Sequence, residues 1–287
     1  MAERKQPVRF GIAMSQTCPW DELVERWQEV EALGFDTVWL VDHFISGNEP
    51  GKDEDIYFEA WAALAGLAMA TSRIRFGCMV SGNTYRNPAL LAKQAVTVDH
   101  ISKGRLEFGI GAGWWEREHA AYGYHFPSKG ELVDRFREAL EIIESLQHNQ
   151  RTDYHGKYYF MDDAPFEPKP LQQPHIPLVI GAFGPRMLRL AAKYADIWNT
   201  RRPPAAAQEL SELLDAKCAE VGRDPAAIMR SVWPSTAPWD SLDSAREMTE
   251  QYHAAGFTDL IFTWPARDQV ETMRAFAREA MPDLRGR

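Results

Sequence analysis

The sequence is poor in the features that mark several large classes of protein. Its three cysteines, Cys18, Cys78 and Cys218, lie far apart and lack the CxxC spacing of zinc and redox sites. This pattern argues against a disulfide framework and favours a reducing cytoplasm. No apolar run approaches the roughly 20 residues that a membrane span requires, and the first residues lack the apolar core of a signal peptide. We therefore expect a soluble, cytoplasmic protein that does not enter a membrane.

Positive charge is also scarce. The 287 residues include 32 lysines and arginines against 41 aspartates and glutamates, which gives a net charge of -9 without any basic block. Nucleic acid and anionic membrane surfaces are poor partners for such a chain. The histidines show no HExxH spacing, and Walker and GxSxG motifs are absent. A small molecule is the expected partner, and no metal site is expected.

Short β-rich runs alternate with longer runs of helical periodicity along the chain. This alternation predicts parallel strands joined by crossover helices. The predicted strands are 8–14, 37–41, 74–81, 106–111, 177–181, 197–200, 228–233 and 259–263. The predicted helices are 20–33, 58–70, 87–102, 132–147, 185–194, 206–221, 243–255 and 268–281.

Such a series of strand and helix units predicts an α/β fold, the TIM (β/α)8 barrel. The main departure is the segment 149–174, where YHGKYYF and the proline-rich APFEPKPLQQP break the rhythm. We interpret this segment as an inserted hairpin and loop between the fourth helix and the fifth strand. No repeat or low-complexity linker divides the chain, so the prediction is a single domain over residues 1–287.

A glycine-rich run, GRLEFGIGAGWW, covers the fourth predicted strand and the residues after it. Glycines weaken a strand, and they are expected where a flat ligand or another backbone approaches closely. A dinucleotide-binding fingerprint would need glycine in place of Trp114 and a position after the first strand of the fold. The run therefore predicts another kind of ligand site, at which Gly111 and Gly113 clear space. At Gly109, tight packing is a real alternative.

In a TIM barrel, the residues that follow the strands form the active-site end. In this sequence, those positions are rich in polar and aromatic side chains. They are Asp42 and His43 after the second strand, Ser81 and Asn83 after the third, Gly113 to Glu116 after the fourth, Gly181 to Pro185 after the fifth, Trp198 and Asn199 at the sixth, and Trp264 after the eighth.

Three segments together carry a family resemblance. They are VWLVDHF, YRNPALLAKQAVTVDHISKGRLEFGIGAGWWEREHAAYG and IPLVIGAFGPRMLRLAAKYADIWN. Over residues 8–200, and in matching order, they resemble the luciferase-like monooxygenase superfamily, and within it the branch that uses the deazaflavin coenzyme F420. The resemblance implies a deazaflavin or FMN ring over the barrel mouth, a homodimer, and a separate reductase that recycles the cofactor.

The resemblance also assigns roles to individual residues. Asp42 and His43 match the pair after the second strand, with the histidine near the reacting ring. The dipeptide Cys78-Met79 falls where relatives place a non-prolyl cis peptide that supports the ring. Further cofactor contacts are implied at Ser81, Asn83, Gly111, Ala112 and Gly113, and a phosphate cradle at Gly181, Ala182, Phe183 and Gly184, before a helix that opens at Pro185.

One position departs from the pattern. Sugar-phosphate dehydrogenases of this superfamily carry a glutamate directly after the GxG, where this chain has Trp114. Sugar-phosphate oxidation is therefore not the expected activity. Glu116 and Glu118 lie two and four residues further on, and whether either has an acid or base role is open.

These features lead to a hypothesis of hydride transfer between reduced F420 and a small organic substrate. His43, whose unperturbed pKa is near 6.5, is the expected proton donor or acceptor, and Asp42 orients it or supports the site. Trp114, Trp115, Tyr85 and Trp198 would wall an apolar substrate pocket. The alternatives are a two-component monooxygenase that uses FMN and O2, and a flavin- or deazaflavin-binding protein without turnover.

Overall fold

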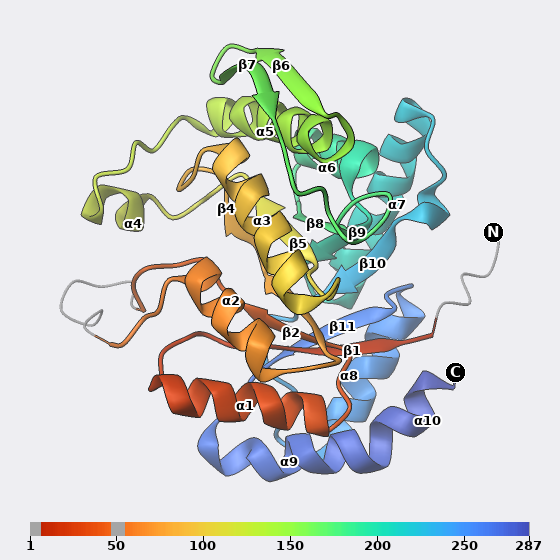
Figure 1. The fold of residues 1–287 in the computed structure, drawn as a ribbon. Coiled ribbons are helices and arrows are strands. Elements are labelled where there is room, and N and C mark those ends of the chain that lie inside the picture. The colour runs from red at the N-terminus through yellow and green to blue at the C-terminus, as the bar shows by residue number, and fades with distance from the viewer. Residues whose placement is uncertain (1–6, 47–54, 287) are drawn as a thin grey trace.

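The computed structural model describes residues 7–46 and 55–286, and a parallel β-sheet rolled into a barrel lies at its centre (Figure 1). The sheet order is β3-β2-β1-β11-β10-β9-β8-β5-β4, and every pairing in it is parallel. The barrel strands are β1 (Arg9–Ala13), β2 (Thr37–Leu40), β3 (Arg75–Cys78), β4 (Ser81–Gly82), β5 (Phe108–Gly111), β8 (Leu178–Gly181), β9 (Ile197–Thr200), β10 (Met229–Val232) and β11 (Asp259–Thr263).

The two ends of this sheet order meet, because β3 and β4 are successive pieces of one strand. Only Met79 and Val80 separate them. A bridge between Phe76 and Leu106 adds a direct link from β3 to the segment that leads into β5. The predicted TIM barrel is therefore confirmed, with its third strand interrupted at the barrel mouth.

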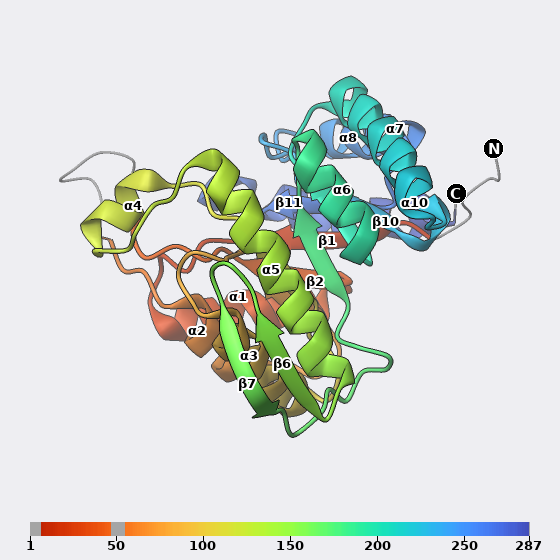
Figure 2. The same cartoon turned by 90° about the horizontal axis from the view of Figure 1, so that it is seen from above.

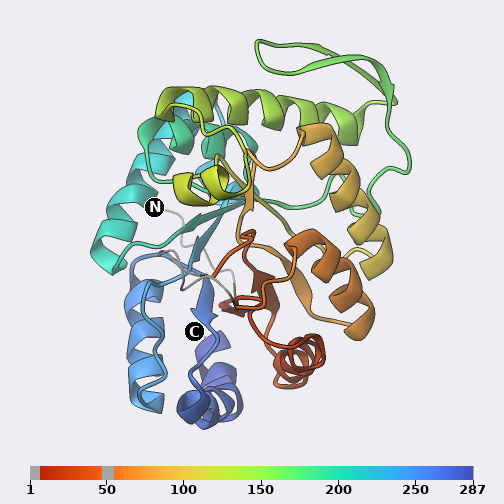
Figure 3. The same cartoon turned by 90° about the vertical axis from the view of Figure 1, so that its left-hand side faces the viewer.

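Helices surround the barrel (Figures 2 and 3). Figure 3 looks onto the carboxyl ends of the strands, with the helices arranged around them. The predicted final helix is divided into a 3-10 turn, α9, a π turn and α10. The helices are α1 (Trp20–Ala32), α2 (Ala60–Ala70), α3 (Pro88–Ser102), α4 (Glu116–Ala121), α5 (Lys129–His148), α6 (Pro185–Tyr194), α7 (Pro204–Val221), α8 (Leu242–Ala254), α9 (Val270–Ala275) and α10 (Met281–Arg285).

Side chains alternate between two apolar layers, as the two-residue period of a strand requires. The larger layer lies between strands and helices and includes Trp198 of β9. The smaller one lies inside the barrel and contains Ala13, Trp39, Met79, Val179, Ile197 and Ile261. Neighbouring residues of one strand thus face either the barrel interior or the helices. This alternation decides which side chains at the strand ends point into the mouth of the barrel.

The predicted insertion is also confirmed. After α5, strands β6 (Arg151–His155) and β7 (Phe160–Pro165) pair antiparallel, and the hairpin lies along α5 (Figure 2). The buried carboxylate of Glu138 on α5 accepts the backbone N–H groups of Lys157 and Tyr158, both at 2.9 Å. The short helix α4 was not predicted. Within the described ranges, no helix is both long enough and apolar enough to span a bilayer.

The barrel closes so tightly between β3 and β5 that a side chain at Gly109 has no room. A Cβ built there would lie 1.8 Å from the carbonyl oxygen of Cys78. Packing, one of the two interpretations left by the sequence, therefore explains this glycine. At Gly184, by contrast, a Cβ would meet no atom within 4 Å.

We expect Gly109→Ala to lower the free energy of unfolding by at least about 3 kcal/mol, because the methyl group would push two backbones apart. Gly184→Ala is the matched control, and its effect should stay within about 1 kcal/mol. Urea denaturation followed by circular dichroism measures both. Equal effects of the two substitutions would contradict the packing argument.

Candidate functional site

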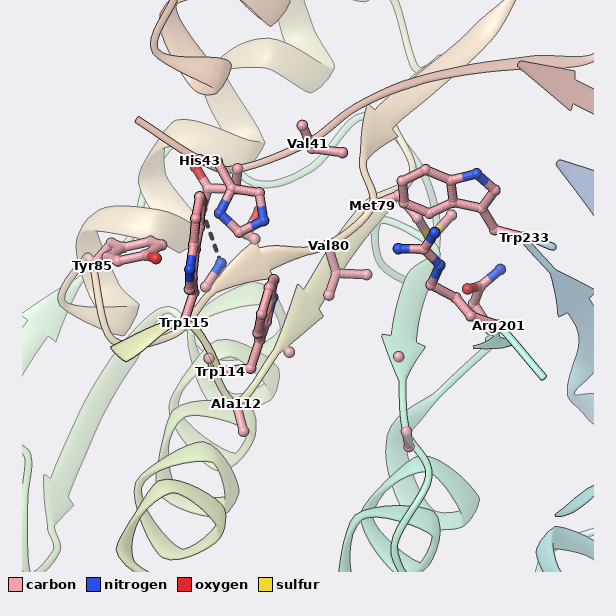
Figure 4. A pocket seen from close by; sticks show the side chains of 18 of the residues that line it. Val41, His43, Met79, Val80, Tyr85, Ala112, Trp114, Trp115, Arg201 and Trp233 are labelled. Atoms are coloured by element: carbon pink, nitrogen blue, oxygen red, sulfur yellow. Dashed lines mark hydrogen bonds between the residues drawn. The ribbon is translucent and has the colours of Figure 1, made fainter. Parts of the chain in front are cut away.

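A cavity of about 590 Å³ opens at the carboxyl ends of the barrel strands (Figure 4). Its volume is within the range of small-molecule and cofactor sites. Residues that follow seven of the eight strand positions contribute to its wall. Of the residues predicted from the sequence, the lining includes Asp42, His43, Met79, Ser81, Tyr85, Gly111, Ala112, Gly113, Trp114, Trp115, Gly181, Ala182, Phe183 and Gly184.

Val80 lies at the middle of the cavity, between the side that holds His43 and the side that holds Arg201 (Figure 4). The peptide bond that precedes it, Met79-Val80, is cis. The predicted position of this bond, Cys78-Met79, was wrong by one residue. Cys78 is still in regular register with Leu40 of β2, so the irregular backbone begins only after it.

The glycine run makes room for protein as well as lining the cavity. A Cβ on Gly111 would come within 2.7 Å of the Val80 side chain, and one on Gly113 within 2.5 Å of Thr84 Oγ1. Gly113 also has a φ of +91°, which disfavours other residues. The space that Gly111 was predicted to clear for a ligand is therefore occupied in large part by Val80, which itself lines the cavity.

His43 is held by a buried carboxylate. Glu118 on α4 is 0% exposed, and its Oε2 lies 3.0 Å from His43 Nδ1. Its Oε1 accepts the backbone N–H groups of Phe44 at 2.6 Å and Ile45 at 3.3 Å, and Oε2 also accepts the hydroxyl of Tyr85. Because an ionised carboxylate can only accept hydrogen bonds, Nδ1 carries the proton and Nε2 is left for a ligand.

Opposing effects act on the protonation of Glu118. Burial raises its pKa, but the hydrogen bonds from His43, Tyr85 and the amide of Phe44 outweigh burial, so the pKa lies below its ordinary range. Burial and the contact with Glu118 both raise the pKa of Tyr85. The carboxylate therefore stays ionised and the phenol stays protonated at neutral pH. Glu116, on the same helix, is exposed and takes no part in this network.

Aromatic rings wall the cavity around His43. Trp114 and Trp115 stack on one another with centroids 5.6 Å apart and planes 9° apart. The imidazole of His43 meets both rings edge on, at 5.7 Å from Trp114 and 4.9 Å from Trp115 (Figure 4). Tyr85 also lines the cavity and is only 8% exposed. The rings therefore make the wall around His43 largely apolar.

Asp42 supports the loop but does not orient His43, which corrects one of its two predicted roles. Its carboxylate forms a bidentate ion pair with Arg86, at 2.6 and 2.9 Å, and accepts the backbone N–H of Gly82 at 2.9 Å. Arg86 also contacts Glu59. The carboxylate that orients the histidine is that of Glu118.

Three predicted site residues do not line the cavity. Trp198 is fully buried, because the alternation along β9 turns it toward the helices, and its indole Nε1 donates to the carbonyl of Ala182 at 3.0 Å. The side chain of Cys78 also packs between strands and helices. Asn83 is 1% exposed, and its amide reaches Tyr159 of the hairpin at 3.4 Å. The predicted roles of Trp198 as a wall and of Asn83 as a ligand contact therefore do not fit the structure.

The loop from Ala182 to Gly184 leads from β8 into α6. Among the described residues, the backbone N–H groups of Phe183 and Gly184 have no hydrogen-bond acceptor. Pro185 begins the helix, whose first-turn amides have no partners within the helix. This loop lines the cavity and presents free donors there, as a phosphate cradle would.

Sequence reasoning missed several lining residues. Val80 and Tyr57 come from segments without a motif, and Arg201 and Trp233 come from the part of the chain after residue 200, where the resemblance is weak. Arg201 directly follows the predicted strand 197–200, and Trp233 is the last residue of the predicted strand 228–233, so position at a strand end alone could have identified them. Across residues 7–46 and 55–286, no cluster of three His, Cys, Asp or Glu side chains could hold a metal ion.

The fold and the cavity define a TIM-barrel protein with a cofactor-sized site at the barrel mouth. Residues 6–284 match the model of the luciferase-like monooxygenase family, so the chain belongs to that family. It is 31% identical to the 5,10-methylenetetrahydromethanopterin reductase of Archaeoglobus fulgidus, over 83% of this chain and 67% of that protein. It is 27% identical to an F420-dependent glucose-6-phosphate dehydrogenase of Microbacterium testaceum, over 98% of both chains.

Solved structures agree on the fold. The F420-dependent tetrahydromethanopterin reductase of Methanopyrus kandleri superposes with a TM-score of 0.83, over 97% of this chain and 100% of that one, at 19% identity. A monooxygenase of Streptomyces bottropensis superposes with a TM-score of 0.78, over 96% and 99%, also at 19% identity. Identities of this size show that the fold is shared. The chemistry has to be inferred from the residues of the site.

We expect Glu118→Gln to lower the free energy of unfolding at pH 7 by about 1–3 kcal/mol. The amide NH2 group of the glutamine cannot accept a hydrogen bond. It would face N–H or O–H groups that now donate to a carboxylate oxygen. The folded-state pKa of Glu118 is lower than its ordinary value of 4.5. The difference in the free energy of unfolding between wild type and variant is therefore fully present above pH 4.5. It is lost as the pH falls through the folded-state pKa of Glu118.

Urea denaturation between pH 3 and pH 8 measures this difference. Glu116→Gln, an exposed change on the same helix, is the control and should stay within about 0.5 kcal/mol. A difference between wild type and Glu118→Gln that grows as the pH falls would refute the assigned network.

Proposed function

We propose that this protein transfers a hydride between coenzyme F420 and a small organic substrate. The observation that carries the proposal is the Glu118-anchored His43 beside an aromatic wall, in a cavity of about 590 Å³ at the barrel mouth. Relatives named as F420-dependent dehydrogenases support the choice of cofactor. The identity of the substrate does not follow from them.

The residues of the cavity fit a flat cofactor with an anionic side chain. Val80, backed by Gly111 and Gly181, offers a surface for a ring. The free amides of Phe183 and Gly184 suit a phosphate. A bound deazaflavin would supply the carbon that gives or accepts the hydride, and the protein would supply orientation and a proton.

In this proposal, His43 moves the proton. Its Nδ1–H is fixed by Glu118, so Nε2 faces the substrate and can give or take a proton there. Asp42 and Arg86 hold the loop on which His43 lies. Trp114 and Trp115 restrict water and position the substrate against the ring.

The cofactor is tested by binding. Titration with F420 and with FMN, followed by absorbance and by calorimetry, should show tight binding of F420 and turnover that does not need oxygen. Tight binding of FMN with oxygen-dependent turnover would favour a two-component monooxygenase instead. Tight binding of either cofactor, with no turnover across a panel of carbonyl and alcohol substrates, would favour a binding protein. The homodimer and the separate reductase stay predictions.

We expect His43→Ala to reduce turnover by about 10²- to 10⁴-fold, the usual contribution of a positioned acid or base. The affinity for F420 should change little, because the ring rests on Val80 and the phosphate on the loop after β8. His155→Ala, an exposed change on the hairpin, is the control for removal of a histidine. Full turnover by His43→Ala with the cofactor bound would exclude the role given to His43.

A further inference from the structure

Arg201 occupies the end of the cavity opposite His43 (Figure 4). It directly follows β9, and its guanidinium lies over the indole of Trp233, 4.2 Å from the ring centroid. Trp233 in turn follows β10, and its Nε1 donates to Thr263 Oγ1, at the end of β11, at 2.9 Å. The ends of adjacent barrel strands therefore set the position of this guanidinium.

The charge of Arg201 has no partner among the described residues. No carboxylate lies within ion-pair distance, and no acceptor takes its side-chain N–H groups. Other arginines of the barrel are neutralised, as Arg86 is by Asp42 and Arg230 by Asp215. Although Arg201 is exposed at the mouth, partial burial against the wall lowers its pKa, and no acidic neighbour opposes this effect. A guanidinium keeps its proton at neutral pH in any case.

Arg201 also decides the charge of the cavity. Among the described residues, the lining contains one ionisable carboxyl side chain, that of Asp42, and Arg86 already neutralises it. The remaining fixed charge on the described wall is thus positive. A cavity with one unpaired cation favours a ligand that carries a negative group.

The stacked geometry leaves the guanidinium ready to bind an oxyanion. One face of the guanidinium covers the indole of Trp233. The N–H groups lie in the guanidinium plane, so their outer edge stays available. Such an edge matches the two oxygens of a carboxylate.

We propose that Arg201, supported by Trp233, is a subsite for an oxyanion of the substrate, most simply a carboxylate. This inference rests on the proposed function and narrows its substrate class. The substrate would carry its negative group toward Arg201 and its reacting group toward His43. The cofactor also carries oxyanions, so the experiment must separate the two sources.

Benzoate and benzamide are suitable probes, because they share ring and shape and differ in charge. Calorimetric titration into the F420-loaded protein should show benzoate binding at least about tenfold more tightly than benzamide, a difference of about 1.4 kcal/mol. Arg201→Gln should remove this preference while leaving benzamide binding and F420 affinity unchanged. Arg202→Gln removes the same charge at the next residue, which does not line the cavity, and should keep the preference.

Two sets of outcomes overturn the inference, and a third overturns the proposed function. Equal binding of the probes, or a preference that survives Arg201→Gln, excludes an oxyanion subsite at Arg201. If F420 blocks benzoate and Arg201→Gln weakens F420 binding, the subsite belongs to the cofactor. If F420 does not bind at all, the proposed function fails. The same titrations of the protein without cofactor then test Arg201 independently.

Discussion

The buried carboxylate of Glu118 is the interaction on which the arrangement of the barrel mouth depends. It gathers donors from the loop after β2, from Tyr85 and from the imidazole of His43. A buried charge is tolerated only where hydrogen bonds replace water, and these donors meet that condition. The carboxylate therefore fixes the tautomer of His43 and joins α4 to a loop some 70 residues earlier in the chain.

The cavity is chemically unequal at its two ends. At one end, an oriented imidazole faces an apolar aromatic wall. At the other, a guanidinium that has no ion-pair partner in the described part of the chain rests on an indole. Val80 stands between them and carries the surface against which a ring can lie. A ligand that reaches both ends is oriented by its own polarity, since its ionic group and its apolar group suit opposite ends.

The barrel was predictable from the sequence because its signal is periodic and local. Strands such as β9 and β11 were placed with their observed bounds, and the inserted hairpin was found from broken rhythm. Side-chain direction was less predictable. Trp198 lies within the predicted strand, yet the two-residue alternation turns it toward the helices. The cis bond was misplaced because a shift of one residue leaves no mark in composition.

The partners within the site could not be predicted, because they depend on tertiary contacts. Glu118 and Glu116 are indistinguishable in the sequence, and only the path of α4 buries one and exposes the other. Asp42 and His43 are neighbours in the chain, but they bond to different partners, Arg86 and Glu118. Arg201 stands in a segment without a recognisable motif, and only its position directly after a predicted strand pointed to the cavity wall.

The segment from Gly111 to α4 carries the aromatic wall and the anchor of His43 together. Trp114, Trp115 and Glu118 lie on one short stretch of chain, whereas Arg201 lies on another strand end. Exchange of this stretch between family members would alter the shape of the cavity and the anchor of His43 in one event. A change at Arg201 would alter the charge of the opposite end without affecting either. The barrel mouth is in this sense modular, and its two ends can diverge independently during evolution.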